Sequence, residues 1–159
     1  MTIDTPFARY QGEVLPEWID WNGHLNLAYY VVLFDKGTDL LFEELGLGLS
    51  YRRDTDRGTF VVETHNRYER ELVVGERVRV STRIVAVDDK RIHLAHEMFR
   101  LADGTRAATQ ELLFLHVDLI ARRVCPFPPE LQARVEAAAV AHAVLPRPDW
   151  VGRRIAMPG

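Results

Sequence analysis

Hydrophobic residues between positions 27 and 45 repeat at helical spacing and predict one long helix. The stripe consists of Leu27, Tyr30, Val31, Phe34, Leu41 and Leu45. Further apolar residues widen the stripe until the first half of the helix is apolar on nearly every side. Such a helix is expected to be enclosed by its surroundings and not to lie on a surface. Gly46 and Gly48 follow, and glycines at this place are typical of a C-terminal cap.

Alternating apolar and polar residues in the rest of the chain predict five strands. These strands are expected at residues 7–19, 59–71, 77–87, 91–101 and 105–120. Pro16 interrupts the first strand, and in the third Val78, Val80, Ile84 and Ala86 are expected to share one face. Short turns at 88–90 and 103–104 join antiparallel neighbours. Residues 51–58 are expected to form a charged, mobile loop, and residues 130–143, after Pro128-Pro129, a short helix.

This order of elements predicts an α+β architecture, in which an antiparallel sheet of about five strands wraps one long buried helix. We expect a single domain over residues 1–145, which includes the C-terminal helix. A Pro- and Arg-rich tail at 146–159 is expected to wrap a surface or a partner chain. The edge strands and the second face of such a sheet need cover, so at least a dimer is expected.

Composition excludes several classes of function. The net charge of −3 provides no basic field for nucleic acid. No apolar stretch approaches the roughly 20 residues that span a bilayer. The first residues have no signal-peptide pattern. A single cysteine, Cys125, suits a reducing compartment and is expected to be structural. We therefore expect a cytoplasmic protein that binds neither nucleic acid nor membrane.

Candidate chemistry is concentrated directly before the long helix, in Asp20-Trp21-Asn22-Gly23-His24-Leu25-Asn26. A carboxylate beside the unpaired N–H groups of a helix start is a candidate catalytic group, so we select Asp20. Asn26 is better placed than Asp20 to be the N-cap of the long helix. Its alternative role is to orient a water. His24 is expected to polarise a carbonyl, to hold Asp20 or to be structural. Gly23 provides an unusual backbone conformation or allows a substrate to approach closely.

Together, these residues resemble a known family. The order of strand, buried helix and four strands resembles the hotdog fold, and Asp20 with Gly23 resembles the active-site turn of its 4-hydroxybenzoyl-CoA thioesterase-like branch. The additional polar residues of the turn are similar to those of a subgroup that hydrolyses betainyl-CoA in carnitine breakdown. Three further segments agree with that subgroup: residues 61–65, 89–93 and 111–118.

The resemblance implies an acyl-CoA thioesterase for a small acyl group, with betainyl-CoA favoured. Asp20 would act as general base or nucleophile, and His24 and Asn26 are further catalytic candidates. Backbone amides around residues 26–29 would stabilise the oxyanion. No cofactor is expected besides CoA as part of the substrate, and a homodimer or dimer of dimers is expected. Substrate-binding candidates are Asn22, Gly23, Leu27, Tyr30 and Glu63.

Glu63 lies in an apolar setting within its strand and has two alternative roles. In the first, Glu63 binds a substrate cation or positions a water, and aromatic faces are added by Trp21, Tyr29 or Tyr30. In the second, Glu63 forms an ion pair with Arg67 or Arg70. Candidate contacts for the CoA phosphates are Lys90, Arg91, Arg122 and Arg123.

Two other functions are compatible with these residues. A hotdog hydratase or dehydratase would use Asp20 with His24, and a non-catalytic module would bind acyl-CoA without turnover. His93 and His96 suggest a metal site, but strand positions three apart point to opposite faces. No metal site is therefore predicted.

Overall fold

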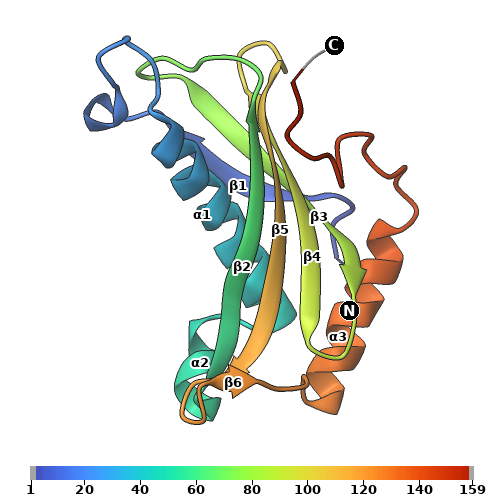
Figure 1. Cartoon of the computed structure of the whole chain (residues 1–159). Helices are drawn as coiled ribbons and strands as arrows, with labels where there is room; N and C mark the ends of the chain where they lie inside the picture. The colour runs from blue at the N-terminus through green and yellow to red at the C-terminus, as the bar shows by residue number, and fades with distance from the viewer. Residues whose placement is uncertain (1–2, 158–159) are drawn as a thin grey trace.

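A computed structural model describes residues 3–157 of the chain, in which a curled antiparallel sheet packs on one long helix (Figure 1). The strand order is β1-β3-β4-β5-β2, and a short sixth strand, β6, pairs with β5. The strands are β1 (Phe7–Glu13), β2 (Arg57–Tyr68), β3 (Arg77–Val87), β4 (Arg91–Arg100), β5 (Arg106–Asp118) and β6 (Arg123–Val124). The helices are the 3-10 helix η1 (Pro16–Trp18), α1 (Leu27–Leu45), α2 (Leu49–Thr55) and α3 (Pro129–His142). This confirms the α+β hotdog architecture.

Helix α1 begins and ends where the sequence predicts. The Asn26 side chain accepts a hydrogen bond from the Ala28 N–H at 3.0 Å, which makes Asn26 the N-cap. Gly46 ends the helix with φ 79°, a left-handed conformation that glycine adopts at low cost. In the middle of the helix, Gly37 lets the backbone approach β3, because an added Cβ would lie 2.7 Å from Val80 Cγ1.

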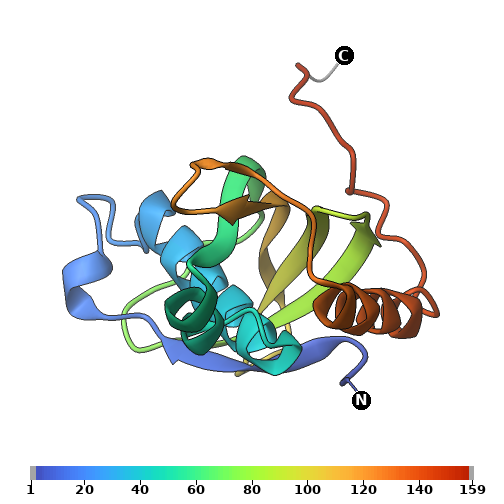
Figure 2. The same cartoon turned by 90° about the horizontal axis from the view of Figure 1, so that it is seen from below.

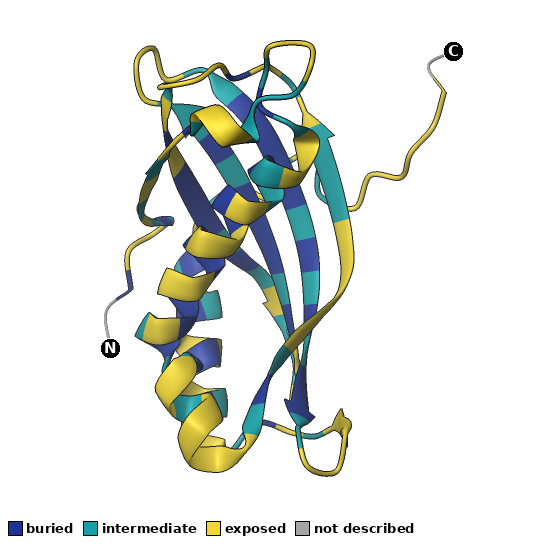
Figure 3. Ribbon diagram, turned by 90° about the vertical axis from the view of Figure 1, so that its left-hand side faces the viewer, coloured by how far each residue is buried: buried dark blue, intermediate teal, exposed yellow. Residues whose placement is uncertain are grey.

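Helix α1 is not enclosed on every side, which corrects the sequence prediction. Tyr30, Leu33, Phe34 and Leu41 are among its buried residues and form the core with the inner face of the sheet. The opposite flank is open in the single chain, and Leu27 on it is 63% exposed (Figure 3). The apolar pattern indicated burial correctly on one side, while the other flank is free to pack against a second chain.

Two further element predictions were wrong. Residues 51–58 are not one loop, because helix α2 covers the first part and β2 begins at Arg57. Gly48, which was expected to end α1, is the N-cap residue of α2. The first strand ends at Glu13, and Pro16 begins the 3-10 helix η1, where its fixed φ is suitable. Both departures place short helical turns where the sequence has no long periodic pattern.

Strand β3 contains a β-bulge between Ile84 and Ala86. Val78, Val80 and Ile84 are buried as predicted, but Ala86 is exposed. The extra residue shifts the alternation by one position, so Ala86 does not share the face of Ile84. Beyond the start of β1, helix α3 covers the edge of β3, and the Ile84 N–H donates to His142 Nδ1 at 2.9 Å (Figure 2).

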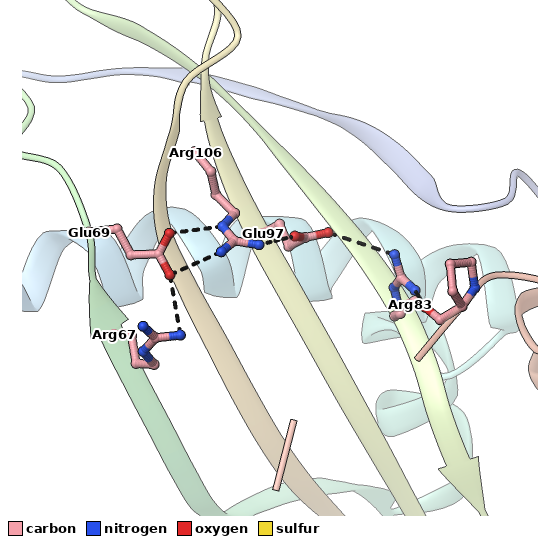
Figure 4. Close-up of polar contacts among 6 residues, drawn as sticks. Arg67, Glu69, Arg83, Glu97 and Arg106 are labelled. Atoms are coloured by element: carbon pink, nitrogen blue, oxygen red, sulfur yellow. Dashed lines mark hydrogen bonds and ion pairs between the residues drawn. The ribbon is translucent and has the colours of Figure 1, made fainter. Parts of the chain in front are cut away.

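The outer face of the sheet, which points away from α1, carries a chain of ion pairs (Figure 4). Arg106 pairs with Glu69 at 2.9 Å and with Glu97 at 2.8 Å. The chain of pairs continues from Glu69 to Arg67 and from Glu97 to Arg83. These side chains are partly buried, and pairing is what makes such a placement tolerable.

The first part of the tail, residues 146–152, contacts this outer face (Figure 1). Arg83 Nη1 donates to the Pro146 carbonyl at 2.7 Å, and the Gly152 N–H donates to Glu111 Oε2 at 2.7 Å. Trp150 lies between these anchors in sequence and is only 3% exposed. Within residues 3–157, no helix combines the length and apolar character needed to cross a membrane.

Candidate active site

The polar segment before α1 forms a tight turn that is closed by backbone hydrogen bonds. The Gly23 N–H donates to the Asp20 carbonyl and the Asp20 N–H donates to the His24 carbonyl, both at 3.0 Å. Ile19 and Leu25 form an antiparallel bridge at the base of the turn. Gly23 has φ 83°, and no atom lies within 4 Å of where its Cβ would be. Glycine is therefore required here by backbone conformation and not by crowding.

The turn also orients the Asp20 carboxylate. The Asn22 N–H donates to Asp20 Oδ1 at 2.8 Å, a local bond that fixes the side chain against its own loop. Among the described residues, Asp20 has no ion-pair partner. Because Asp20 is partly exposed and lines a cleft, its second carboxylate oxygen is available to a ligand.

The start of α1 leaves the backbone amide of Leu27 without a partner. The Asn26 side chain occupies the Ala28 N–H, and the Tyr29 N–H donates to the Asn26 carbonyl. The Asn26 N–H donates to the Trp18 carbonyl. Within residues 3–157, the Leu27 N–H has no acceptor. Of the predicted oxyanion donors, Leu27 therefore remains free to bind an anionic oxygen.

Asp20 and the start of α1 face a common cleft of about 320 Å³. The cleft lies between the turn and the end of β2. It is lined by Asp20, His24, Leu25, Leu27, Tyr30, Tyr68, Glu69, Arg70 and Glu71. The structure thus brings together four of the predicted site residues. Asn22, Gly23 and Asn26 shape the turn and the helix cap but do not line the cleft.

His24 faces Glu71 across the cleft and is not paired with Asp20. His24 Nε2 lies 3.2 Å from Glu71 Oε2, and both side chains are exposed to solvent. The Asp20–His24 pair that a hydratase would need is therefore not assembled in this chain. Glu71 was missed by the sequence analysis, because nothing in the strand pattern marks it as a partner for a distant turn.

Two tyrosines form the apolar wall of the cleft. The Tyr30 and Tyr68 rings meet edge to face with centroids 5.1 Å apart. The Tyr30 hydroxyl donates to the Arg70 carbonyl at 3.2 Å, and burial raises the pKa of Tyr30 to about 12. Tyr30 therefore stays protonated near neutral pH. Tyr68, Glu69 and Arg70 were not selected from the sequence, since they belong to a strand end with no recognisable motif.

Glu63 is not part of this cleft. Its side chain lines a second cavity on the outer face of the sheet, together with His65, His93 and Glu111. Neither Arg67 nor Arg70 pairs with it within the described part of the chain, because Arg67 pairs with Glu69. Of the aromatic residues suggested beside Glu63, Trp21 is 96% exposed and Tyr29 stacks on Trp18.

Three other histidines and the cysteine contact groups of this chain. His93 lies 2.7 Å from Glu111 on the outer face, whereas His96 is buried on the inner face, which confirms that they point to opposite sides. Cys125 Sγ lies 3.4 Å from His116 Nδ1, and the same nitrogen also lies 2.9 Å from the Cys125 carbonyl. Among residues 3–157, no three potential metal ligands cluster.

The predicted phosphate contacts are divided between two places. Arg91 pairs closely with Asp88, and Lys90 lies 3.5 Å from Asp89, so both are partly neutralised. Arg122 and Arg123 are exposed where β6 begins. None of these four residues lines the Asp20 cleft.

A curled antiparallel sheet on a long helix, with a carboxylate at the turn before that helix, defines a hotdog-fold thioesterase. Residues 14–135 match the thioesterase-like superfamily, and the chain belongs to that family. It is therefore a thioester hydrolase.

Comparison with individual proteins narrows the relationship. The chain is 41% identical to a betainyl-CoA thioesterase of Pseudomonas aeruginosa, over 94% of both chains. It is 35% identical to an L-carnitine dehydrogenase/betainyl-CoA thioesterase of Agrobacterium fabrum, over 96% of this chain and 31% of that protein. Among solved structures, a Staphylococcus aureus protein in complex with CoA superimposes with a TM-score of 0.90 at 28% identity, covering 99% of both chains.

Proposed function

We propose that this chain hydrolyses the thioester of a small acyl-CoA, with betainyl-CoA as the favoured substrate. Asp20 and Leu27 line the same cleft, and the Leu27 N–H has no acceptor among residues 3–157. This observation carries the proposal. The betainyl-CoA thioesterase similar to this chain and the CoA complex of a structural relative support the substrate class.

Asp20 would act in one of two ways. As general base it takes a proton from water, whose oxygen then bonds to the acyl carbon. As nucleophile it forms a mixed anhydride that water later hydrolyses. In both cases the carbon–sulfur bond breaks, CoA leaves as a thiolate, and water supplies the oxygen of the free acid. The Asn22 N–H orients the carboxylate for either role.

Charge that develops on the thioester oxygen would be stabilised by the Leu27 N–H and the positive end of the α1 dipole. His24, held toward the cleft by Glu71, would polarise the same carbonyl from the other side. Asn26 would serve this step indirectly, because its side chain occupies the Ala28 N–H and sets the geometry of the helix start.

The acyl end of betainyl-CoA is a trimethylammonium group, which has no N–H to donate. Aromatic faces and nearby carboxylates are therefore the groups that can recognise it. Tyr30 and Tyr68 provide the aromatic wall of the cleft, and Glu69 and Glu71 provide negative charge on the same side. This set replaces Glu63, Trp21 and Tyr29, none of which lines the cleft.

Release of free thiol from betainyl-CoA tests the proposal. We expect the wild-type protein to release CoA, and Asp20→Asn to lower kcat at least ~100-fold because the lost group acts mainly in the transition state. The circular dichroism of the variant should match the wild type. Near-wild-type turnover by Asp20→Asn would remove Asp20 from the mechanism.

We also propose that the chain forms a homodimer through β2. This strand is an edge of the sheet in the single chain and has unpaired backbone groups along its length. Phe60, Val61 and Val62 on it are 56%, 49% and 52% exposed. Pairing with β2 of a second copy would satisfy the backbone and place these side chains beside those of the facing strand. In an antiparallel pair, the start of one β2 approaches the Tyr68 end of the other, where the cleft lies.

A further inference from the structure

The second cavity, on the outer face of the sheet, has a volume of about 390 Å³. Its floor is formed by β2, β4 and β5, and the docked tail forms one wall. The polar side chains that line it are Glu63, His65, His93, Glu111, Arg153 and Arg154. Because these residues use the face of β2 and not its edge, pairing of β2 with a second copy would leave them accessible.

Not all of these groups are free. Glu111 is fully engaged, since its two oxygens meet His93 Nε2 and the Gly152 N–H, each at 2.7 Å. The latter bond holds the tail directly before Arg153. Within residues 3–157, the side chains of Glu63, His65, Arg153 and Arg154 have no hydrogen-bond or ion-pair partner. The cavity therefore presents two guanidinium groups, an imidazole and one carboxylate to a ligand.

This combination favours a phosphorylated nucleoside. Guanidinium groups bind phosphate through paired, charge-assisted hydrogen bonds. A carboxylate near them would repel phosphate but accepts hydrogen bonds from sugar hydroxyls or an amino group. A ligand with phosphates at one end and such donors at the other satisfies both requirements.

A row of side chains connects this cavity to the Asp20 cleft. Glu63, His65 and Arg67 alternate along β2 and lie on its outer face. Glu69 follows directly after the strand and pairs with Arg67 and Arg106 on the same face. Glu63 and His65 line the cavity, and Glu69 lines the cleft. From Glu63 to Tyr68 the strand rises roughly 17 Å. An extended pantetheine arm of CoA spans roughly 15 Å from sulfur to the first phosphate, by ordinary bond geometry.

We infer that this cavity binds the nucleotide end of CoA, with Arg153 and Arg154 on the phosphates and Glu63 on the sugar or base. The inference rests on the proposed function, because it takes the thioester to lie at Asp20. The tail thereby contributes directly to substrate binding, and Arg67 lies beside the path of the pantetheine arm.

Calorimetric binding of CoA and of pantetheine tests this site without any catalytic step. The double variant Arg153→Gln/Arg154→Gln should bind CoA at least about tenfold more weakly, because two charge-assisted contacts are lost. Its affinity for pantetheine, which lacks the nucleotide, should be unchanged. Arg153→Lys/Arg154→Lys should restore part of the CoA affinity. The matched control is Arg52→Gln/Arg53→Gln on the exposed surface of α2, which should bind CoA as the wild type does.

The inference is overturned if the Arg153/Arg154 variant binds CoA as the wild type does, or loses CoA and pantetheine affinity equally. It is also overturned if the double variant Arg122→Gln/Arg123→Gln weakens CoA binding while the Arg153/Arg154 variant does not. Hydrolysis is measured separately with betainyl-CoA. If CoA binding depends on Arg153 and Arg154 but betainyl-CoA is not hydrolysed, the proposed substrate is rejected and this site is kept. If betainyl-CoA is hydrolysed but CoA binding does not depend on these arginines, the proposed substrate is kept and this site is rejected.

Discussion

Asp20 owes its position to the backbone of its own turn more than to contacts with distant residues. The Asn22 N–H holds the carboxylate, and Gly23 provides the left-handed conformation that closes the loop. The position of the Asp20 carboxylate thus depends on Gly23, which has no side chain.

Substitution of Gly23 tests this dependence. Gly23→Ala should destabilise the fold by about 1–2 kcal/mol, the cost of a left-handed alanine, and lower the melting temperature by a few degrees. It should also lower kcat, because the Asp20 turn is displaced. Gly23→Asn should retain more of both, since asparagine tolerates this conformation.

Gly58 provides the matched control for Gly23. Its added Cβ also has no atom within 4 Å, but its φ is not in the left-handed region. Gly58→Ala should therefore leave the melting temperature and kcat nearly unchanged. Equal losses in Gly23→Ala and Gly58→Ala would contradict the conformational explanation.

His96 is a second residue whose environment has a measurable consequence. It is fully buried between Thr38 and Thr82, with hydrogen-bond distances of 3.0 and 2.8 Å, and burial lowers the pKa of His96 to about 3. The ordinary pKa of a histidine is 6.5, which serves as the reference for the unfolded chain. The folded state therefore favours neutral His96, and its contribution is complete above pH 6.5. It declines as the pH falls from 6.5 toward 3.

The expected result is a loss of up to about 2 kcal/mol in the free energy of unfolding between pH 7 and pH 5 from His96 alone. Urea unfolding at both values measures it. His96→Gln, which cannot titrate, should be less stable at pH 7 but should lose less stability between the two values. Equal losses in variant and wild type would assign the pH dependence to other groups, such as His116 and His142.

At the scale of elements, the long helix and most of the strands could be predicted because their patterns extend over many residues. The departures occur where one residue changes the local rule. A bulge in β3 turns Ala86 outward, and the short helix α2 begins at Gly48. Helix α2 is held by a distant contact, because the Tyr51 hydroxyl lies 2.8 Å from His116 Nε2. No periodic pattern in residues 49–55 predicts the contact between Tyr51 and His116.

One wall of the candidate site could be predicted from the sequence, and the opposite wall could not. The motif at residues 20–26 identified the turn, since its polar residues are adjacent in sequence. The opposite wall, with Tyr68 and Glu71, comes from a strand end about forty residues later, and only the fold brings it there. Glu63 was selected from its polarity within an apolar strand, but polarity alone does not specify which face of the sheet it occupies.

At the scale of the whole molecule, the open edge of β2 predicts self-association. Val62→Lys places a charge in the exposed apolar segment of β2, directly beside the facing strand of a β2 pair. Two such strands would bring two like charges together, which is destabilising. We expect this variant to shift the protein from dimer toward monomer in sedimentation velocity, and to lose activity as it does so. Val140→Lys, on the exposed side of α3, is the control and should remain dimeric. A wild-type monomer would reject the proposed pairing.

Strand β2 has three tasks along its twelve residues: it is the free edge of the sheet, it provides Tyr68 to the cleft, and it connects the cleft to the second cavity. Evolution of a new acyl preference through β2 would therefore disturb assembly as well. The turn before α1 and the C-terminal tail contribute to the substrate sites but not to the proposed pairing of two chains. Divergence among relatives should consequently be slower in β2 than in exposed segments that have none of these three roles.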